Sequence, residues 1–330
     1  MRAPPFLTKV YADNAARIEG RRNLARDLAL HSMNSALRPL ERVAVRVRPQ
    51  RRPPIVLIVG APRSGTTLLY QLMSRHLEVA YVTNFMARFW MAPVLGQWLN
   101  EVVLRGANPL AGELESAFGV TRGPLAPHEF SWLWRRWVDL EASDHLTRAE
   151  LEAVDWRPLL DELEAMAAWS GRPLVLKALN HVDYHIEFLA ARLPQARFVH
   201  IEREPRFVVQ SILESRVGRY GDVGAWWSLR PRDWASWRSA SPVDQVCHQV
   251  RDCLEHVRAG LATLPRERRL ELSYEELVRE PGSELRRLAG FVGCSLRHVH
   301  QLDSLQLRPS NRDRVDPETL AAIQTRIETW

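Results

Sequence analysis

Residues 60–67 form the stretch GAPRSGTT, which directly follows the apolar run IVLIV at residues 55–59. The stretch has the G-x-x-x-x-G frame of a phosphate-binding loop, but Thr66 stands where such loops carry a lysine. A glycine-rich turn and the start of a helix both direct backbone N–H groups toward one point, where an oxyanion binds. Ser64, Thr66 and Thr67 add hydroxyl donors, and Arg63 adds a cation. Without the lysine, a 5′-phosphate carrying a different transferable group fits better than a triphosphate.

This loop resembles the 5′-phosphosulfate loop of the sulfotransferases that use 3′-phosphoadenosine 5′-phosphosulfate (PAPS), in which a strand precedes PRSGTT or PKSGTT. Members of that family bind the 3′-phosphate of the donor with an arginine at the end of a later strand and a serine eight residues on. Here RFVHI is followed by EREPRFVVQS, which gives Arg203 and Ser211 at that spacing. The planar fork of arginine matches a phosphate, and Ser211 lies two turns into the following helix. The two motifs occur in the order that the family requires.

Two further segments extend the resemblance. The segment LELSYEEL looks like the strand and Tyr-Glu-(Asp/Glu)-Leu sequence of the family, whose tyrosine approaches the adenine, and it indicates Tyr274. Near the C-terminus, LRPSNRDR offers Ser310 or Arg312 as a contact to the 3′-phosphate. The resemblance therefore implies a donor site made of Arg63, Ser64, Gly65, Thr66, Thr67, Arg203, Ser211 and Tyr274.

Sulfuryl transfer needs an in-line approach by the acceptor and stabilisation of charge on the leaving phosphate. Lys177 ends the apolar run PLVLK, where the family places a lysine that contacts the oxygen bridging phosphate and sulfate. Only one other lysine, Lys9, occurs in the chain, which strengthens this assignment. Arg63 assists from the other side. A sulfuryl group carries less negative charge than a phosphoryl group, so we expect no metal.

The base that takes the proton of the acceptor hydroxyl has three candidates. Glu129 ranks first, because RGPLAPHEF resembles the P-x-E segment of some bacterial members and a tryptophan-rich cap would raise the proton affinity of the carboxylate. His181, four residues after Lys177, ranks second, and His128 ranks third. Asn84 falls near the position of the glutamate base of tyrosyl-protein sulfotransferases, and its amide is no proton acceptor. Peptide tyrosine is therefore disfavoured as the acceptor.

The pattern of elements predicts an α/β fold. Short apolar runs alternate with helical patterns, which is typical of a three-layer, P-loop-like domain with a central parallel sheet of about five strands and helices on both faces. We expect an N-terminal helical segment over residues 1–53 and a single sulfotransferase domain over 54–330. Cap insertions around 84–170 and 216–242 interrupt this domain, and such inserts cover the carboxyl ends of the strands. The expected strands cover residues 55–59, 173–179, 196–204 and 268–274.

Composition narrows the function classes. The formal charge of +6 and the pI near 9.6 favour anionic ligands, but no nucleic-acid recognition motif accompanies them. Cys247, Cys253 and Cys294 form neither a disulfide framework nor a metal-ligand spacing, and the first two are expected to be buried on one helix. No signal-peptide core or membrane-spanning apolar run is present, which predicts a cytoplasmic protein.

The sequence therefore predicts a metal-independent enzyme that transfers a sulfuryl group from PAPS, leaving 3′-phosphoadenosine 5′-phosphate (PAP), to a hydroxyl or, as second choice, an amine. Small molecules, carbohydrates and lipids all remain open as acceptors. The alternatives are a nucleoside or small-molecule kinase with a degenerate phosphate loop, and a non-catalytic nucleotide-binding relative. Trp226, Trp227, Trp234 and Trp237 either cover an acceptor or attach the second insertion to the core.

Overall fold

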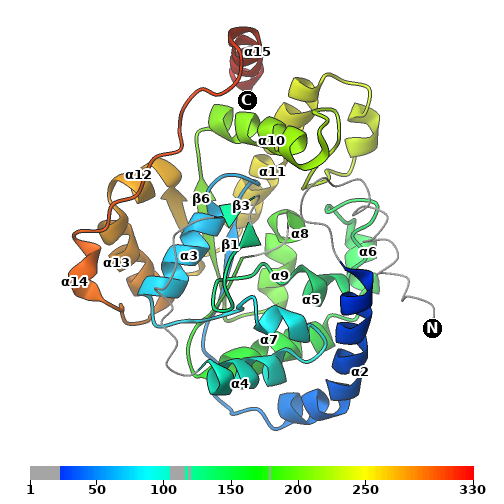
Figure 1. Cartoon of the computed structure of the whole chain (residues 1–330), viewed down its shortest axis with the longest axis vertical. Helices are drawn as coiled ribbons and strands as arrows, with labels where there is room; N and C mark the ends of the chain where they lie inside the picture. Colours follow the sequence, from blue (N-terminus) through cyan, green and yellow to red (C-terminus); the bar gives the residue numbers. More distant parts are fainter. Residues whose placement is uncertain (1–22, 105–115, 118–119, 178–179) are drawn as a thin grey trace.

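The computed structural model describes residues 23–104, 116–117, 120–177 and 180–330. Five strands form the central sheet in the order β2-β5-β1-β6-β7, and each neighbouring pair is parallel (Figure 1). The α/β class and the five-stranded parallel sheet predicted from the sequence are thus confirmed. The strands are β1 (Ile55–Val59), β2 (Ala80–Tyr81), β5 (Leu174–Lys177), β6 (Ala196–Glu202) and β7 (Arg269–Ser273).

The central strand β1 explains why the sheet is covered on both faces. All five of its residues are buried, because IVLIV presents apolar side chains to both sides of the pleat. Ile55, Leu57 and Val59 belong to one apolar core, and Val56 and Ile58 belong to the other. The sheet is therefore the middle layer of three.

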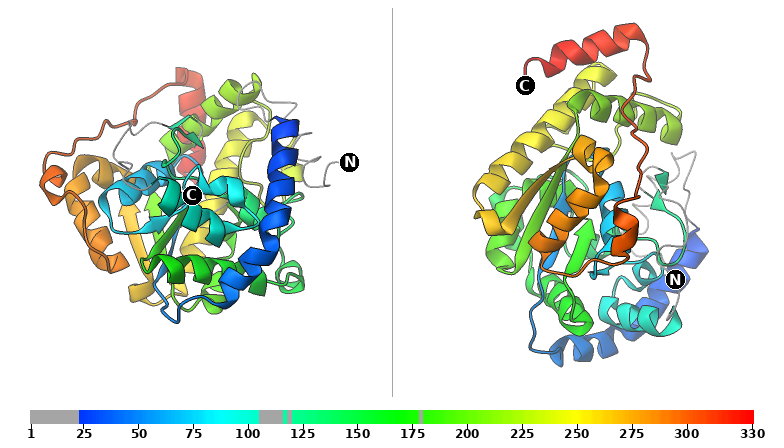
Figure 2. Two further views of the ribbon diagram at one scale, coloured as in Figure 1. Left: turned by 60° about the horizontal axis from the view of Figure 1, so that its bottom comes forward. Right: turned by 90° about the vertical axis from the view of Figure 1, so that its left-hand side faces the viewer.

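Two sets of helices form the outer layers, as the two views of Figure 2 also show. On the face of Val56 the helices are α3 (Thr66–His76), α12 (Tyr274–Arg279), α13 (Pro281–Val292) and α14 (Val299–Leu302). On the face of Leu57 they are α7 (Arg157–Ser170), α8 (Asn180–Tyr184), α9 (Ile186–Arg192), α10 (Pro205–Tyr220) and α11 (Pro242–Ala262).

The remaining elements lie mainly in the two insertions and near the chain ends. Shortly after β2, the hydroxyl of Thr83 donates to Asn100 Oδ1 at 2.7 Å and so ties the start of the first insertion to α4 (Pro93–Val103). These elements are η1 (Met86–Phe89), α4 (Pro93–Val103), β3 (Ser116–Ala117), β4 (Val120–Thr121), α5 (Ser131–Arg135), α6 (Arg148–Ala153), η2 (Trp234–Trp237), η3 (Arg266–Arg268) and α15 (Pro317–Ile327).

The N-terminal segment contributes the long helix α2 (Leu24–Arg46), which packs against α4 and α7. Asn23 caps this helix by accepting a hydrogen bond from the Arg26 N–H at 3.1 Å. Farther along, the buried carboxylate of Glu41 accepts hydrogen bonds from the backbone N–H groups of Val94 and Leu95, at 2.9 and 3.0 Å. Glu41 thus satisfies the first N–H groups of α4 and joins α2 to the first insertion. Residues 1–22 of the expected helical segment lie outside the described residues.

Three details of the observed fold can be compared with what the sequence predicted. The strand expected at 173–179 is observed at 174–177, and residues 178–179 lie outside the described ones. The edge strand β2 was not predicted, because two residues are too short for a periodic pattern. Cys247 and Cys253 are both buried on α11, as expected. Along the part of the chain that is described, no helix combines the length and apolar character needed to cross a bilayer.

Candidate active site

The loop between β1 and α3 depends on two glycines with left-handed backbone. Gly60 has φ of +144°, and a Cβ there would stand 2.5 Å from the carbonyl oxygen of Ile201 in β6. Gly65 has φ of +106°, and a Cβ there would stand 2.6 Å from the ring of Tyr274. No larger residue fits at either position without displacing β6 or Tyr274. The loop backbone is therefore packed directly against β6 and Tyr274.

Two of the predicted donor hydroxyls of this loop, those of Ser64 and Thr67, have distinct surroundings. The hydroxyl of Ser64 is buried and has no hydrogen-bond partner within the described residues. The ammonium of Lys177 donates to the hydroxyl oxygen of Thr67 at 3.1 Å, which brings the end of β5 to the start of α3. A buried hydroxyl without a partner is costly unless a ligand accepts from it. The donor set fits an oxyanion such as the 5′-phosphosulfate group.

The second predicted anion site adjoins the first. The Arg203 guanidinium donates from Nη1 to the carbonyl oxygen of Arg63 at 3.2 Å. Arg63 in turn donates from Nε to the hydroxyl oxygen of Ser211 at 2.9 Å, so a side chain of the first motif contacts one of the second. Arg203 also lies over the ring of Tyr274, with 4.7 Å from Cζ to the ring centroid. The structure thus brings Arg63, Arg203, Ser211 and Tyr274 together.

A segment after α14 completes this region. Arg203 donates from Nε to Asn311 Oδ1 at 2.7 Å and from Nη2 to the carbonyl oxygen of Ser310 at 3.1 Å. The hydroxyls of Tyr274 and Ser310 are 2.7 Å apart. Ser310 was a candidate from the sequence, whereas Asn311 was not, since its contact with Arg203 spans 108 residues of chain. Arg312, the other candidate in this segment, is exposed.

The electrostatics of the region favour an anion. Burial, and next the charge of Arg203, lower the pKa of the Arg63 guanidinium. Burial is also the largest cause that lowers the pKa of Arg203, and the charge of Arg314 adds to it. Arg314 has a carboxylate partner, Glu214, at 3.1 Å. Burial and mutual repulsion both destabilise the charged guanidinium groups of Arg63 and Arg203. A bound phosphate would reduce both effects.

Lys177 and Glu129 form an ion pair beside the loop. The ammonium of Lys177 lies 3.5 Å from Glu129 Oε1, and the two side chains are 14% and 37% exposed. Glu129 comes from the loop before α5, so the first insertion delivers it to the end of β5. A partly exposed carboxylate beside this lysine can reach an acceptor hydroxyl that enters from solvent.

The two histidine candidates are placed differently. His181 is fully buried, packs edge-on against Trp134, and has no hydrogen-bond partner at either ring nitrogen within the described residues. Burial holds its pKa well below the usual value. His128 accepts a hydrogen bond from the Phe130 N–H through Nδ1, at 2.8 Å. Of the three predicted bases, Glu129 is therefore the one whose side chain is both next to Lys177 and accessible.

A carboxyl group that the sequence analysis missed lies beneath the loop. Asp183 of α8 is buried, and its Oδ1 accepts a hydrogen bond from the Gly60 N–H at 2.9 Å. Burial, with the nearby carboxyls of Asp144 and Glu129, raises its pKa well above the usual value. Its position follows from the pairing of β1 with β5, and no local spacing in the sequence indicates it. Asp183 therefore fixes the first peptide of the phosphate loop.

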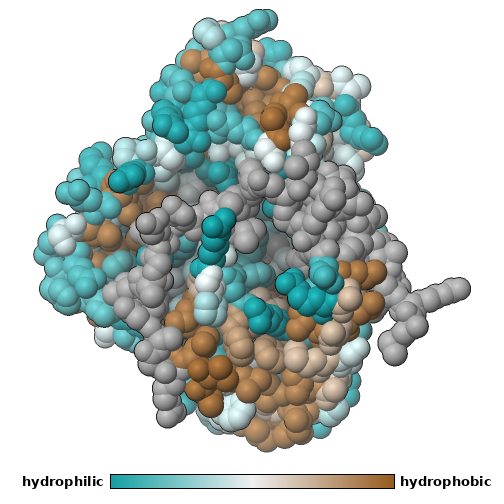
Figure 3. All heavy atoms as spheres, in the orientation of Figure 1, coloured by the Kyte–Doolittle hydropathy of each residue, from teal (hydrophilic) through white to brown (hydrophobic). Residues whose placement is uncertain are grey.

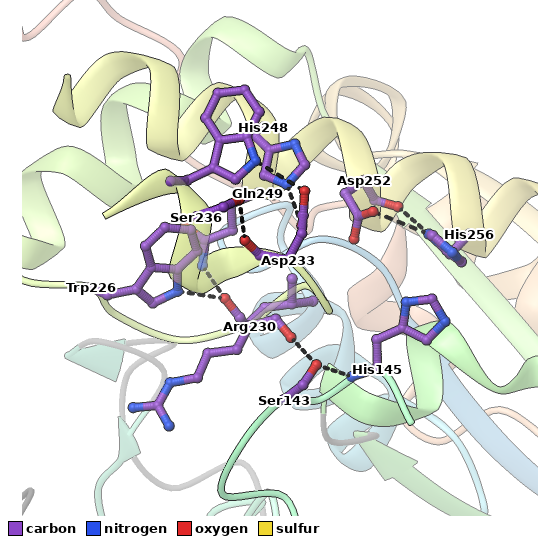
Figure 4. Close-up of polar contacts among 12 residues, drawn as sticks. Ser143, His145, Trp226, Arg230, Asp233, Ser236, His248, Gln249, Asp252 and His256 are labelled. Atoms are coloured by element: carbon purple, nitrogen blue, oxygen red, sulfur yellow. Dashed lines mark hydrogen bonds and ion pairs between the residues drawn. The ribbon is translucent and has the colours of Figure 1, made fainter. Parts of the chain in front are cut away.

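The two insertions form a joined cap, part of which Figure 4 shows. Asp144 of the first insertion accepts a hydrogen bond from the Arg230 N–H of the second at 2.8 Å, and Ser143 donates to the Arg230 carbonyl at 2.9 Å. Burial raises the pKa of Asp144 to about 6. Within the second insertion, the Trp237 ring stacks on His248 of α11 with 4.2 Å between centroids.

The tryptophans of the second insertion serve packing. The indole N–H of Trp226 donates to the carbonyl oxygen of Leu229 at 2.9 Å (Figure 4). Trp234 donates to the carbonyl oxygen of Ala142 in the first insertion at 2.7 Å. Trp227 is buried in the core on the α11 side of the sheet. Trp227 thus attaches the second insertion to the core, whereas the bonds of Trp226 and Trp234 lie within and between the insertions.

Comparison with known proteins identifies the family. The family model described as "Sulfotransferase family" matches residues 54–298, from the strand before the phosphate loop to the end of the region after α13. The chain belongs to the sulfotransferase family.

Its relatives include enzymes with different acceptors. The chain is 26% identical over 275 residues to the omega-hydroxy-beta-dihydromenaquinone-9 sulfotransferase Stf3 of Mycobacterium tuberculosis (strain CDC 1551 / Oshkosh), covering 75% of this chain and 66% of the relative. It is 28% identical over 262 residues to carbohydrate sulfotransferase 6 of Homo sapiens, covering 73% and 64%. The match thus spans slightly less than two thirds of each relative's length.

Solved sulfotransferase structures share the fold. Sulfotransferase STF9 from Mycobacterium avium aligns with a TM-score of 0.52 at 15% identity, covering 99% of this chain and 78% of that one. STF1 from Mycobacterium tuberculosis H37Rv aligns with a TM-score of 0.52 at 15% identity, covering 82% and 75%. At this level of identity the likeness concerns the three-layer architecture alone.

Proposed function

We propose that this chain is a PAPS-dependent sulfotransferase that acts on a hydroxyl group. The phosphate loop from Arg63 to Thr67 binds the 5′-phosphosulfate group, and Arg203 with Ser211 binds the 3′-phosphate. Tyr274 lies between these sites and provides the surface for the adenine. The single observation that carries the proposal is the contact of Arg203 with the Arg63 carbonyl at 3.2 Å, since one bisphosphorylated adenosine bridges two adjoining anion sites.

The proposed reaction uses Glu129 for the acceptor hydroxyl and Lys177 for the leaving phosphate, so their 3.5 Å ion pair must open when the substrates bind. The donor supplies a sulfuryl group attached to a phosphate that leaves with the electron pair of the broken S–O bond. Glu129 takes the proton of the acceptor hydroxyl as its oxygen forms the new S–O bond. Lys177, held by Thr67 at 3.1 Å, stabilises the negative charge that develops on the leaving phosphate oxygen. Arg63 assists from within the loop.

The acceptor is proposed to be a hydroxyl-bearing small molecule, carbohydrate or lipid. The names of the relatives support this class, because one acts on a hydroxylated menaquinone and others on carbohydrates. The partly exposed carboxylate of Glu129 fits an acceptor that enters through the cap.

Isothermal titration calorimetry with PAP, AMP and ATP tests the donor assignment. We expect tight binding of PAP alone, because AMP lacks the group for Arg203 and the loop lacks the lysine that reaches a γ-phosphate. The Arg203→Ala variant should lose about 10- to 100-fold in PAP affinity, the value of charge-assisted hydrogen bonds, and bind AMP as before.

Arg258→Ala is the matched control, because Arg258 has the same charge and pairs with Glu202 at the end of the same strand, β6. It should bind PAP as the parent does. Equal affinities of the parent for PAP, AMP and ATP would overturn the donor assignment, and preferential binding of ATP with magnesium would support a kinase instead.

A further inference from the structure

One end of the molecule carries exposed apolar side chains on three helices that pack together. Figure 3 shows apolar residues gathered over the lower end, where α2, α4 and α7 lie in Figure 1. Leu40 and Val43 on α2 and Val47, the residue that caps its end, recur at intervals of three and four residues, so they lie on one side of the helix. On α4, Trp98 and Val102 are four residues apart and are 59% and 49% exposed. We name this surface the α2–α4 face and define it by Leu40, Val43, Val47, Trp98, Val102 and Trp169, all of which are exposed.

The two helices present one continuous surface because the end of α7 lies between them. The indole N–H of Trp169 donates to the carbonyl oxygen of Ala44 in α2 at 3.0 Å. Three residues on, Arg172 pairs with Glu101 of α4 at 3.2 Å. Single exposed apolar side chains are common on protein surfaces and need no partner. A contiguous group of them marks a surface that binds another molecule or a membrane.

The α2–α4 face borders a hollow that is lined by arginines. The hollow measures about 240 Å³ and is lined by residues 46 and 48–53, which include four arginines, and by Glu164, Ala167 and Gln195. Arg48 is neutralised by Glu164 at 3.1 Å. Arg46, Arg51 and Arg52 are exposed and have no carboxylate partner in the described ranges. Since Arg46 directly precedes Val47, uncompensated positive charge adjoins the apolar surface.

This combination fits the surface of a bilayer that contains anionic lipids. Apolar residues enter the boundary of the acyl chains, tryptophans favour the interfacial region, and arginines bind anionic headgroups. A second copy of the chain fits less well, because the chain carries a net charge of +6 and a two-fold contact through this face would bring arginines of both copies together. We propose that the α2–α4 face docks on anionic membranes, with a lipid phosphate in the arginine-lined hollow.

The proposal is independent of the identity of the acceptor. In Figure 3 the apolar surface lies below the hollowed centre of the same view, where the ends of the strands lie in Figure 1. The residues that define the α2–α4 face include none of the proposed donor-site residues. A protein that docks in this way and sulfates a carbohydrate, or one that docks and does not turn over PAPS, would both agree with the inference.

Flotation with lipid vesicles tests the docking. The whole chain is mixed with vesicles of phosphatidylcholine alone, or of equal parts of phosphatidylcholine and phosphatidylglycerol, and the bound fraction is measured across lipid concentrations. We expect binding to the mixed vesicles that weakens with salt and little binding to the neutral ones. Equal binding to both kinds of vesicle, or none to either, would overturn the proposal.

Neutralising the hollow should weaken binding. Each arginine near an anionic surface contributes about a fivefold factor, so the combined variant Arg46→Gln, Arg51→Gln and Arg52→Gln should bind mixed vesicles about 100-fold more weakly. All three side chains are exposed, and PAP binding with thermal unfolding checks that the fold is retained.

A matched variant controls for net charge. Arg251→Gln, Arg266→Gln and Arg279→Gln remove the same three charges from exposed positions on α11, η3 and α12. This variant should retain vesicle binding to within about threefold if the location of the charge matters more than its total. Equal losses in both triple variants would refute a specific docking face.

The apolar side of the face has its own test. Val43→Ser combined with Val47→Ser should reduce the binding that remains at high salt, because apolar insertion is not screened. Sedimentation velocity without lipid decides the competing explanation. If the parent chain is a dimer and the valine variant is a monomer, a second copy of the chain covers the face. That result would overturn the proposal.

Discussion

Replacing Gly65 with alanine tests the geometry of the phosphate loop most directly. At φ of +106°, a residue with a Cβ pays about 1–3 kcal/mol of backbone strain. The new Cβ would also stand 2.6 Å from Tyr274 Cδ2, so the ring has to retreat by about 0.8 Å to reach the 3.4 Å of ordinary contact. That movement weakens the 2.7 Å hydrogen bond from Tyr274 to Ser310, worth about 1 kcal/mol, and the contact with Arg203.

We expect Gly65→Ala to lower the free energy of unfolding by about 2–4 kcal/mol and the affinity for PAP by about tenfold or more. Urea denaturation measures the first quantity, and calorimetry measures the second. Both effects have one origin, since the ring that blocks the Cβ is the ring beneath Arg203.

Alanine substitutions at two other glycines separate the effect of backbone strain from that of the collision with Tyr274. Gly123 has φ of +95° but nothing within 4 Å of a Cβ, so Gly123→Ala should show the strain alone. Gly290 lies inside α13 with open space and no positive φ, so Gly290→Ala should stabilise the protein by about 0.5–1 kcal/mol. The opposing result is that Gly65→Ala lowers the free energy of unfolding no more than Gly123→Ala does and keeps full PAP affinity. That result would contradict the close packing of Tyr274 against the loop.

Three further predictions concern the reacting groups and the acid beneath the loop. Lys177→Met should lower kcat by about 10²- to 10³-fold, with PAP affinity changed little, in assays with labelled donor; a normal kcat would remove Lys177 from the mechanism. Glu129→Gln should lower kcat by about 10²- to 10⁴-fold. His181→Gln should leave kcat unchanged when its stability equals that of the parent. The reverse result would make His181 the base. Burial raises the pKa of Asp183, so the native state keeps a proton that the unfolded chain loses above about pH 4, and stability falls as pH rises. Asp183→Asn keeps an oxygen acceptor for Gly60 but has no proton to lose, so urea denaturation across pH should show a shallower decline, and an unchanged slope would contradict the assignment.

The sequence predicted four of the five strands of the sheet, β1, β5, β6 and β7. IVLIV is a continuous apolar run followed by Gly60 and appears as β1, and RFVHI, in which three of five residues are apolar, appears in β6. The strand β2 has two residues and takes its place from hydrogen bonding to β5, which no local pattern reveals. The docking of α2 on α4 was also not predicted, because it depends on the long-range bonds of Glu41.

The candidate site divides in the same way. Residues within motifs of known spacing, such as Arg63, Arg203 and Ser211, were found in the sequence, and the structure brings them together. Asn311 and Asp183 were missed, because each meets its partner only through the packing of distant elements. Sequence spacing indicates which residues share a turn of chain, whereas tertiary packing decides which carboxyl lies beneath the loop.

The scarcity of lysine has a practical consequence for chemical footprinting. Lys177 and Lys9 are the only lysine side chains in the sequence, and Lys177 lies between Thr67 and Glu129 with 14% of its side chain exposed. An acylating reagent followed by peptide mass spectrometry therefore reports on the proposed reaction centre through Lys177, with Lys9 as the other internal amine on a separate part of the chain. Slower acylation of Lys177 in the presence of a nucleotide would register occupancy without any acceptor being known.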